Sequence, residues 1–150
     1  MKNKKLFIIA AFIFILDKLS KMIILHKNIV YYPLVKGYLS ITSLVNTGAA
    51  FSLFQGKQLI LIIISGIAIL SFIYYFSTRK ITSFEQIGWG LLLGGAFGNL
   101  ADRISYNCVI DFINIECLKF PVFNVADAAI SIGAILIFYH SFFLERKKDA

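Results

Sequence analysis

Charged residues are scarce in this chain of 150 residues. They make up 15% of the chain, against about 25% in an average soluble domain, whereas 59% of the residues are hydrophobic. A soluble fold cannot hide that much apolar surface. The composition therefore predicts one membrane domain, over residues 1–150, whose apolar surface is shared between protein and lipid.

Cysteine and histidine are also scarce. Cys108 and Cys117 have no further Cys or nearby His to complete a metal set. A disulfide between them stays open, although two ordinary small side chains is the interpretation we favour. His26 and His140 are expected at opposite membrane faces, and no H-E-x-x-H motif is present. We expect no metal and no organic cofactor.

The apolar residues gather in four long runs. A bilayer core needs about 20 apolar residues per helix. The first run leads into Asp17 and Lys18 without an A-x-A-like cleavage site, which predicts a retained helix rather than a removed secretory signal. The predicted fold is an all-α membrane protein with four transmembrane helices, near Leu6–Leu25, Leu59–Phe76, Ile87–Ala101 and Val122–Leu144.

The basic residues predict the orientation of these helices. A net charge of +7 could suggest nucleic acid, but Lys and Arg flank the apolar runs and form no aromatic-interleaved patch. By the positive-inside rule, both termini face the cytoplasm, and segments 26–58 and 104–121 face outward. The cytoplasmic set is Lys2, Lys4, Lys5, Arg79, Lys80, Arg146, Lys147 and Lys148.

The first outer segment has a β pattern. Hydrophobic and polar residues alternate over 38–42 after a Lys-Gly turn signal at 36–37. This pattern predicts a short strand or hairpin on the outer membrane surface, which makes the segment a small extracytoplasmic β-rich element.

Small residues in the third and fourth helices predict close packing. Gly90, Gly94 and Gly98 recur every four residues and therefore share one helix face. Ala129 and Gly133 have the same spacing in the fourth helix. Small residues at this spacing let helix backbones approach closely in lipid.

Four of the eight carboxylates are not explained as solvated charges. In the predicted orientation, Asp17 lies in the outer half of the first helix and Asp102 at the outer end of the third. Asp111 lies in the following loop, and Asp127 lies one to two turns into the fourth helix. Ionisable groups in a membrane helix cost a few kcal/mol each, so they persist mainly at a cavity or a functional partner.

Two of these aspartates are expected to be structural or ambiguous. Asp17 and Lys21 are four residues apart and share a helix face. Two roles stay equally open for them, a structural ion pair that neutralises itself and a pair that lines a functional site. For Asp102 and Lys18 we favour a structural role at the membrane interface.

Asp111 and Asp127 are the better candidates for chemistry. Neither has a basic residue three or four positions away. Two carboxylates held close together cannot both ionise cheaply. One can then act as general base on a water while the other, protonated, polarises a carbonyl.

Five ordered sequence blocks resemble the bacterial lipoprotein signal peptidases (signal peptidase II). Residues 17–21 fit D-x-x-x-K, residues 46–51 fit N-x-G-A-A-F, and residues 98–103 fit G-N-x-x-D-R. Residues 109–112 fit V-x-D-F, and residues 123–127 fit F-N-x-A-D.

The chain departs from the family pattern at two positions. Asn107 stands where the family usually has Gly, and Phe120 stands where Trp often precedes Pro. Since Asn tolerates left-handed backbone better than most residues, the first departure concerns only the detailed loop conformation.

The resemblance implies an aspartic endopeptidase of the bacterial cytoplasmic (inner) membrane, with its active site near the outer face. Its substrate would be a prolipoprotein with a diacylglyceryl-modified cysteine, cleaved just before that cysteine. Membrane lipids are the other expected partner, and we expect a monomer. The implied catalytic pair is Asp111 and Asp127, and the implied substrate-binding set is Asp17, Lys21, Asn46, Gly48, Asn99, Arg103 and Asn124.

Two other classes of function fit the sequence less well. Intramembrane carboxylates also serve proton relays in transporters, but the inner halves of the predicted helices offer only His140 as a titratable group. A structural assembly factor would explain the glycine face but not the aspartates without counter-ions.

The predicted topology can be tested with reporter fusions. Reporters placed after Lys80 or at the C-terminus should be cytoplasmic, and reporters within 104–121 should be external, because of the asymmetry of basic residues. An external C-terminus would contradict this orientation.

Overall fold

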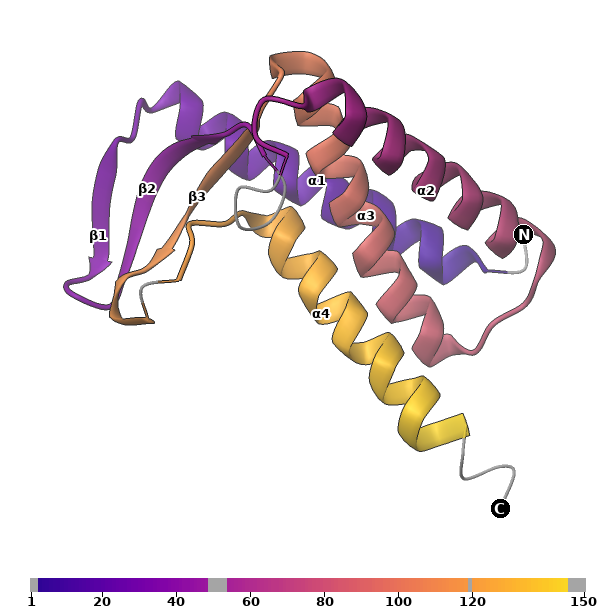
Figure 1. The fold of residues 1–150 in the computed structure, drawn as a ribbon. Coiled ribbons are helices and arrows are strands. Elements are labelled where there is room, and N and C mark those ends of the chain that lie inside the picture. The colour runs from indigo at the N-terminus through magenta and orange to yellow at the C-terminus, as the bar shows by residue number, and fades with distance from the viewer. Residues whose placement is uncertain (1–2, 49–53, 119, 146–150) are drawn as a thin grey trace.

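The computed structural model describes residues 3–48, 54–118 and 120–145, and side chains up to residue 143. Helices make up most of the described chain, and a small sheet lies at one end of the bundle, away from the N-terminus (Figure 1). The helices are α1 (Lys4–His26), α2 (Gln58–Thr78), α3 (Ser83–Tyr106) and α4 (Val125–Tyr139), with short turns η2 (Glu116–Leu118) and η3 (His140–Glu145). The strands are β1 (Tyr31–Val35), β2 (Leu39–Asn46) and β3 (Val109–Ile115).

Helix α3 is the centre of the bundle, because α1, α2 and α4 all pack on it. Its glycines make this possible. A methyl group added at Gly94 would lie 2.6 Å from the Ala10 carbonyl oxygen of α1, and one added at Gly88 would lie 3.2 Å from the Gly133 carbonyl oxygen of α4. The predicted close packing of glycine faces is therefore confirmed for α3 and α4.

The sheet contains the predicted hairpin and one further strand. Strands β1 and β2 pair antiparallel around Gly37, whose φ of 79° belongs to the left-handed region. Strand β3 pairs antiparallel with β2, with Leu44 opposite Asp111. The prediction that Asp111 lies in a loop is thus wrong, because pairing with β2 turns this segment into a strand.

Helix α4 begins later than predicted. Asn124 is its N-cap and forms a capping box with Asp127, which lies in the first turn rather than one to two turns into the helix. The residues before Asn124 are held in extended conformation, since Phe123 bridges to Ile113 of β3. The predicted start at Val122 is wrong for this reason.

The turn from α3 into β3 uses the unusual residue noted in the sequence. Asn107 follows the last residue of α3 and has a φ of 54° and a ψ of 23°. Its backbone N–H donates to the Arg103 carbonyl oxygen, which closes the helix. This turn thus uses the tolerance of Asn for left-handed backbone, at the position where the family usually has Gly.

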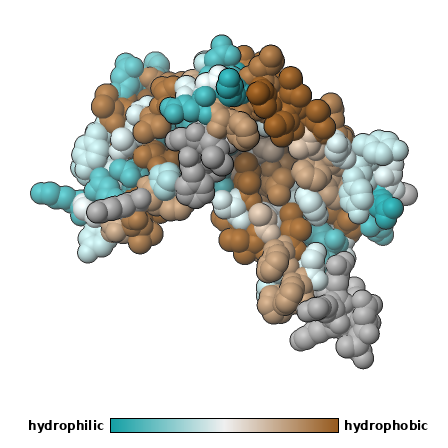
Figure 2. Space-filling view, viewed as in Figure 1, coloured by the Kyte–Doolittle hydropathy of each residue, from teal (hydrophilic) through white to brown (hydrophobic). Residues whose placement is uncertain are grey.

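The outer surface of the bundle is strongly apolar. Figure 2 shows hydrophobic side chains over α2, and among them Ile64, Ile67 and Leu70 are each more than half exposed. By length and apolar composition, two described helical segments could cross a membrane, Gln58–Thr78 and Val125–Phe143. Helix α1 carries Asp17, Lys18 and Lys21, which lower its hydropathy.

Some sequence predictions fall on residues outside the described ranges. They include the Ala-Ala-Phe part of the N-x-G-A-A-F block at 49–51, and the basic residues at 2 and 146–148. The two cysteines are described, and both are free thiols, with Cys108 buried and Cys117 exposed.

The packing of α1 on α3 can be tested with a matched pair of substitutions. Gly94→Ala should lower the free energy of unfolding by about 1–3 kcal/mol, because the new methyl group collides with α1. Gly66→Ala in α2 is the control, since no atom lies within 4 Å of an added methyl, and it should be neutral or stabilising by up to about 1 kcal/mol. Thermal unfolding in detergent measures both, and equal midpoints for the two variants would contradict the packing.

Candidate active site

Asp111 is a buried carboxylate held by two amides. Its Oδ2 accepts a hydrogen bond from Asn46 Nδ2 at 2.9 Å, and its Oδ1 accepts one from Asn124 Nδ2 at 2.6 Å. The side chain is 1% exposed. Burial raises the pKa of Asp111 to about 6, the hydrogen bond from Asn46 opposes this shift, and the charge of Asp127 adds to it.

Asp127 is held by a second pair of donors. Its Oδ1 accepts a hydrogen bond from Asn99 Nδ2 at 2.7 Å. Its Oδ2 accepts the backbone N–H of Asn124 at 3.3 Å, as part of the capping box. The beginning of α4 therefore orients this carboxylate.

Asn124 joins the two aspartates. Its Nδ2 donates to Asp111, and its Oδ1 accepts the backbone N–H of Asp127 at 2.8 Å. The same Nδ2 also lies 3.2 Å from Asn99 Oδ1. Because the Asn124 side chain is fully buried, this small amide fixes a strand carboxylate and a helix carboxylate relative to each other.

A buried ion network lies behind these amides. Lys21 Nζ contacts Asp17 Oδ2 at 2.8 Å, Asp102 Oδ2 at 2.7 Å and Asn99 Oδ1 at 3.2 Å. Lys18 Nζ contacts the other oxygen of Asp102, also at 2.7 Å. Both oxygens of Asp102 therefore have a lysine partner. Because the network contains two lysines and two aspartates, its charges cancel.

The network also fixes the start of α4. Asp17 Oδ1 accepts the backbone N–H of Ala126 at 3.0 Å. This N–H is one of the first-turn groups that have no partner within the helix. Helix α1 thereby positions the first turn of α4, which carries Asp127.

Arg103 connects α3 to the loop after β2. Its Nη2 donates to the Gly48 carbonyl oxygen at 3.1 Å, and the Gly48 N–H donates to Asn46 Oδ1 at 2.9 Å. Within the described residues, the buried Arg103 Nε has no hydrogen-bond partner. A buried N–H without a partner is unusual, and this one can donate a hydrogen bond to an acceptor atom of a bound molecule.

A cavity of about 650 Å³ opens over the two aspartates, a size typical of ligand sites. Its charged and amide groups are Asp111, Asp127, Asn46, Asn99 and Arg103, and most of the other lining residues come from α4 and from 120–123. Of the other predicted substrate-binding residues, Asp17, Lys21, Gly48 and Asn124 lie outside the cavity lining.

Sequence reasoning did not identify the pairing of Asp102 with two lysines of α1. Asp102 and Lys18 were expected at the membrane interface, but Asp102 is fully buried and is shared by Lys18 and Lys21. The available signal was the spacing of these lysines, which places them one helical turn apart. No cluster of three or more His, Cys, Asp or Glu suited to a metal occurs in the part of the chain that the structure describes.

The raised pKa of Asp111 predicts a pH-dependent stability. A carboxyl whose pKa rises from 3.8 to about 6 on folding destabilises the folded state when ionised, by roughly 2–3 kcal/mol. This penalty is complete above about pH 6 and disappears as the pH falls toward 4. Asp111→Asn should therefore remove part of the loss in thermal midpoint between pH 5 and pH 8. An unchanged pH dependence would contradict the burial of an ionisable Asp111.

Comparison with known proteins places this geometry in a family. Residues 9–143 match the family described as signal peptidase (SPase) II. A lipoprotein signal peptidase of Nostoc punctiforme is 40% identical over 95% of this chain and 92% of its own length. One from Clostridioides difficile is 34% identical over 88% of this chain and 90% of its own length.

Two solved structures share the fold. A bacterial membrane enzyme determined by the in meso method at 2.3 Å resolution is 33% identical, with a TM-score of 0.84 over 95% of this chain and 88% of that chain. A second, at 1.9 Å, is 34% identical, with a TM-score of 0.81 over 91% of each chain. With its paired aspartates and its match over most of the sequence, the chain belongs to the signal peptidase II family.

Proposed function

We propose that this protein is an aspartic endopeptidase that removes the signal peptide from diacylglyceryl-modified prolipoproteins, cleaving immediately before the lipidated cysteine. The observation that carries this proposal is the pair Asp111 and Asp127, joined through Asn124 at one cavity. The family and the names of the relatives support the substrate class.

In the proposed mechanism, the two carboxylates share one proton between them. The ionised aspartate takes a proton from a water molecule, whose oxygen attacks the scissile carbonyl carbon. The protonated aspartate donates to the carbonyl oxygen as negative charge develops there. The pKa of Asp111, raised to about 6 by burial, supports a site in which one carboxyl holds its proton to a higher pH than an ordinary aspartate does.

The amides would orient the aspartates rather than react. Asn46 and Asn99 donate to the oxygens of Asp111 and Asp127, so each carboxylate is held in one rotamer. Arg103 lines the cavity, and its Nε, which has no partner among the residues that the structure describes, would donate to a carbonyl oxygen of the substrate backbone. Preorganised donors of this kind need no rearrangement during the reaction.

We further propose that the chain forms one membrane domain with four spans and both termini in the cytoplasm. Helices α1 and α3 would cross the bilayer although they carry charges, because the charges of Asp17, Lys21, Asp102 and Arg103 are buried inside the bundle. The sheet would then lie at the outer surface and guide the substrate toward Asp111. The acyl chains of the substrate would remain among the helices.

The proposed chemistry is tested with purified protein and a lipidated prolipoprotein. Asp111→Asn and Asp127→Asn should each abolish cleavage, with insertion and substrate binding largely intact, because an amide cannot exchange the catalytic proton. Asp102→Asn should be milder, since this residue pairs with Lys18 and Lys21 outside the cavity. Mass detection of the released signal peptide measures all three, and substantial turnover by either of the first two variants would refute the dyad.

The proposed substrate choice follows from the depth of the site. Each buried methylene contributes about 0.8 kcal/mol, so two acyl chains hold the scissile bond near the membrane surface. A misplacement of about 1 Å can cost on the order of 10²-fold in rate. The diacylglyceryl-modified precursor should therefore be strongly preferred over the same polypeptide with a free cysteine. Equal cleavage of both in one lipid preparation would refute positioning by lipid and leave the aspartic chemistry standing.

A further inference from the structure

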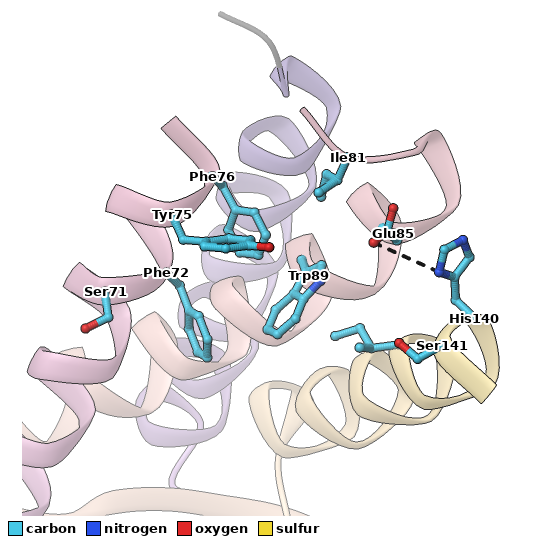
Figure 3. Close-up of a pocket in the computed structure, with 10 residues that line it drawn as sticks. Ser71, Phe72, Tyr75, Phe76, Ile81, Glu85, Trp89, His140 and Ser141 are labelled. Carbon is cyan, nitrogen blue, oxygen red and sulfur yellow. Dashed lines mark ion pairs between the residues drawn. The ribbon is translucent and has the colours of Figure 1, made fainter. Parts of the chain in front are cut away.

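A second pocket lies at the other end of the bundle from the aspartates. It has a volume of about 500 Å³ and lies between α2, α3 and the end of α4 (Figure 3). Trp89 is its central side chain, with the rings of Phe72 and Phe76 each 5.0 Å away between centroids. We call it the Trp89 pocket, and the proposed peptidase does not use it.

One end of the Trp89 pocket is polar. Glu85 Oε1 faces His140 Nδ1 at 4.0 Å, which is too long for a hydrogen bond (Figure 3). Glu85 Oε2 is engaged in the capping box of α3, where it accepts the Thr82 backbone N–H at 2.8 Å. Both side chains are largely buried, at 20% and 9% exposed. A carboxylate oxygen and a ring nitrogen therefore lie close enough together for one donor group beside them to bond both.

The geometry of this space favours a primary ammonium group. An ammonium with three N–H donors can bond two acceptors about 4–5 Å apart with hydrogen bonds of about 2.8 Å. Glu85 and His140, with Nδ1 as the acceptor nitrogen, provide such a pair. A quaternary ammonium has no N–H to donate. Tyr75 lines the pocket, and the Arg79 guanidinium lies 5.5 Å from its ring, so a positive charge that could attract a phosphate lies beside the pocket.

The remainder of the pocket suits an acyl chain. Helices α2 and α4 both pack on α3, and the space over Trp89 lies between these two helices, each of which is long and apolar enough to cross a membrane. We propose that the Trp89 pocket binds a membrane phospholipid with a primary-amine head group, such as phosphatidylethanolamine. Its ammonium lies between Glu85 and His140, and an acyl chain lies along Phe72 and Trp89.

The experiment uses Trp89 as its own reporter, because it is the only tryptophan of the chain. The full chain is placed in phosphatidylcholine bilayers, and lipids with brominated chains are added to quench its fluorescence. Half-maximal quenching should need about tenfold less brominated phosphatidylethanolamine than brominated phosphatidylcholine or phosphatidylglycerol, because hydrogen bonds to a charged group are lost with the latter two. Equal quenching by the three lipids would overturn the proposal, and so would a preference for phosphatidylglycerol.

A pair of variants separates contact with the head group from general contact with lipid. Glu85→Gln removes the charge but keeps the capping box, since Gln also serves at this position, and it should abolish the preference. Glu116→Gln removes one charge at the sheet end and should leave the preference intact. Cleavage activity of both variants reports that the fold is preserved.

A series of methylated lipids tests the same contact on the unmodified protein. Stepwise N-methylation of the head group removes its donors one at a time, and affinity should fall sharply when fewer than two N–H groups remain. An unchanged preference in Glu85→Gln, or equal affinity across the methylated series, would overturn the proposal.

Discussion

The hydrogen bonds of Asn124 are the contact on which the rest of the site depends. This one side chain caps α4, binds the β3 carboxylate of Asp111, and fixes the turn that carries Asp127. Both carboxylates therefore lie at the junction of the sheet and the bundle, joined through this side chain. A buried amide that loses its hydrogen-bond partners costs about 1–3 kcal/mol. A displacement of the sheet or of α4 would therefore also disturb the aspartates that Asn124 holds.

The cost of burying charge explains the composition of the bundle. Lys21 lies between Asp17 and Asp102, and each of these groups would be expensive to bury alone. Paired, they let α1 and α3 present polar faces to each other and apolar faces to the outside. This inward polarity lowers the hydropathy of α1, whereas α2, which carries no such residues, is long and apolar enough to be identified as a span.

Features set by local spacing were predictable from the sequence. The ion pair of Asp17 with Lys21 follows from a four-residue spacing, and the residue type of Asn107 is compatible with the left-handed turn found there. The hairpin around Gly37 follows from alternation and a turn signal. Each of these depends on residues close together in the chain, so no knowledge of tertiary contacts was needed.

Features set by distant contacts were not predictable. The strand character of Asp111 depends on pairing with β2, and the late start of α4 depends on the bridge of Phe123 to β3. The shared pairing of Asp102 with Lys18 and Lys21 joins two helices, and the spacing of the two lysines on α1 does not by itself name a partner on α3. The catalytic roles of the aspartates and the binding roles of the surrounding residues stay predictions.

The central claim is that Asp111 and Asp127 form one proton-sharing pair, and infrared titration of the carboxyl C=O stretch tests it most directly. Wild-type protein in lipid should show one protonated carboxyl that is lost near pH 6, in line with the raised pKa of Asp111. In Asp127→Asn this titration should move to lower pH, because the neighbouring charge is gone, and in Asp111→Asn it should change or disappear. A wild-type site whose carboxyls all titrate near pH 4, with no response to either substitution, would contradict the account.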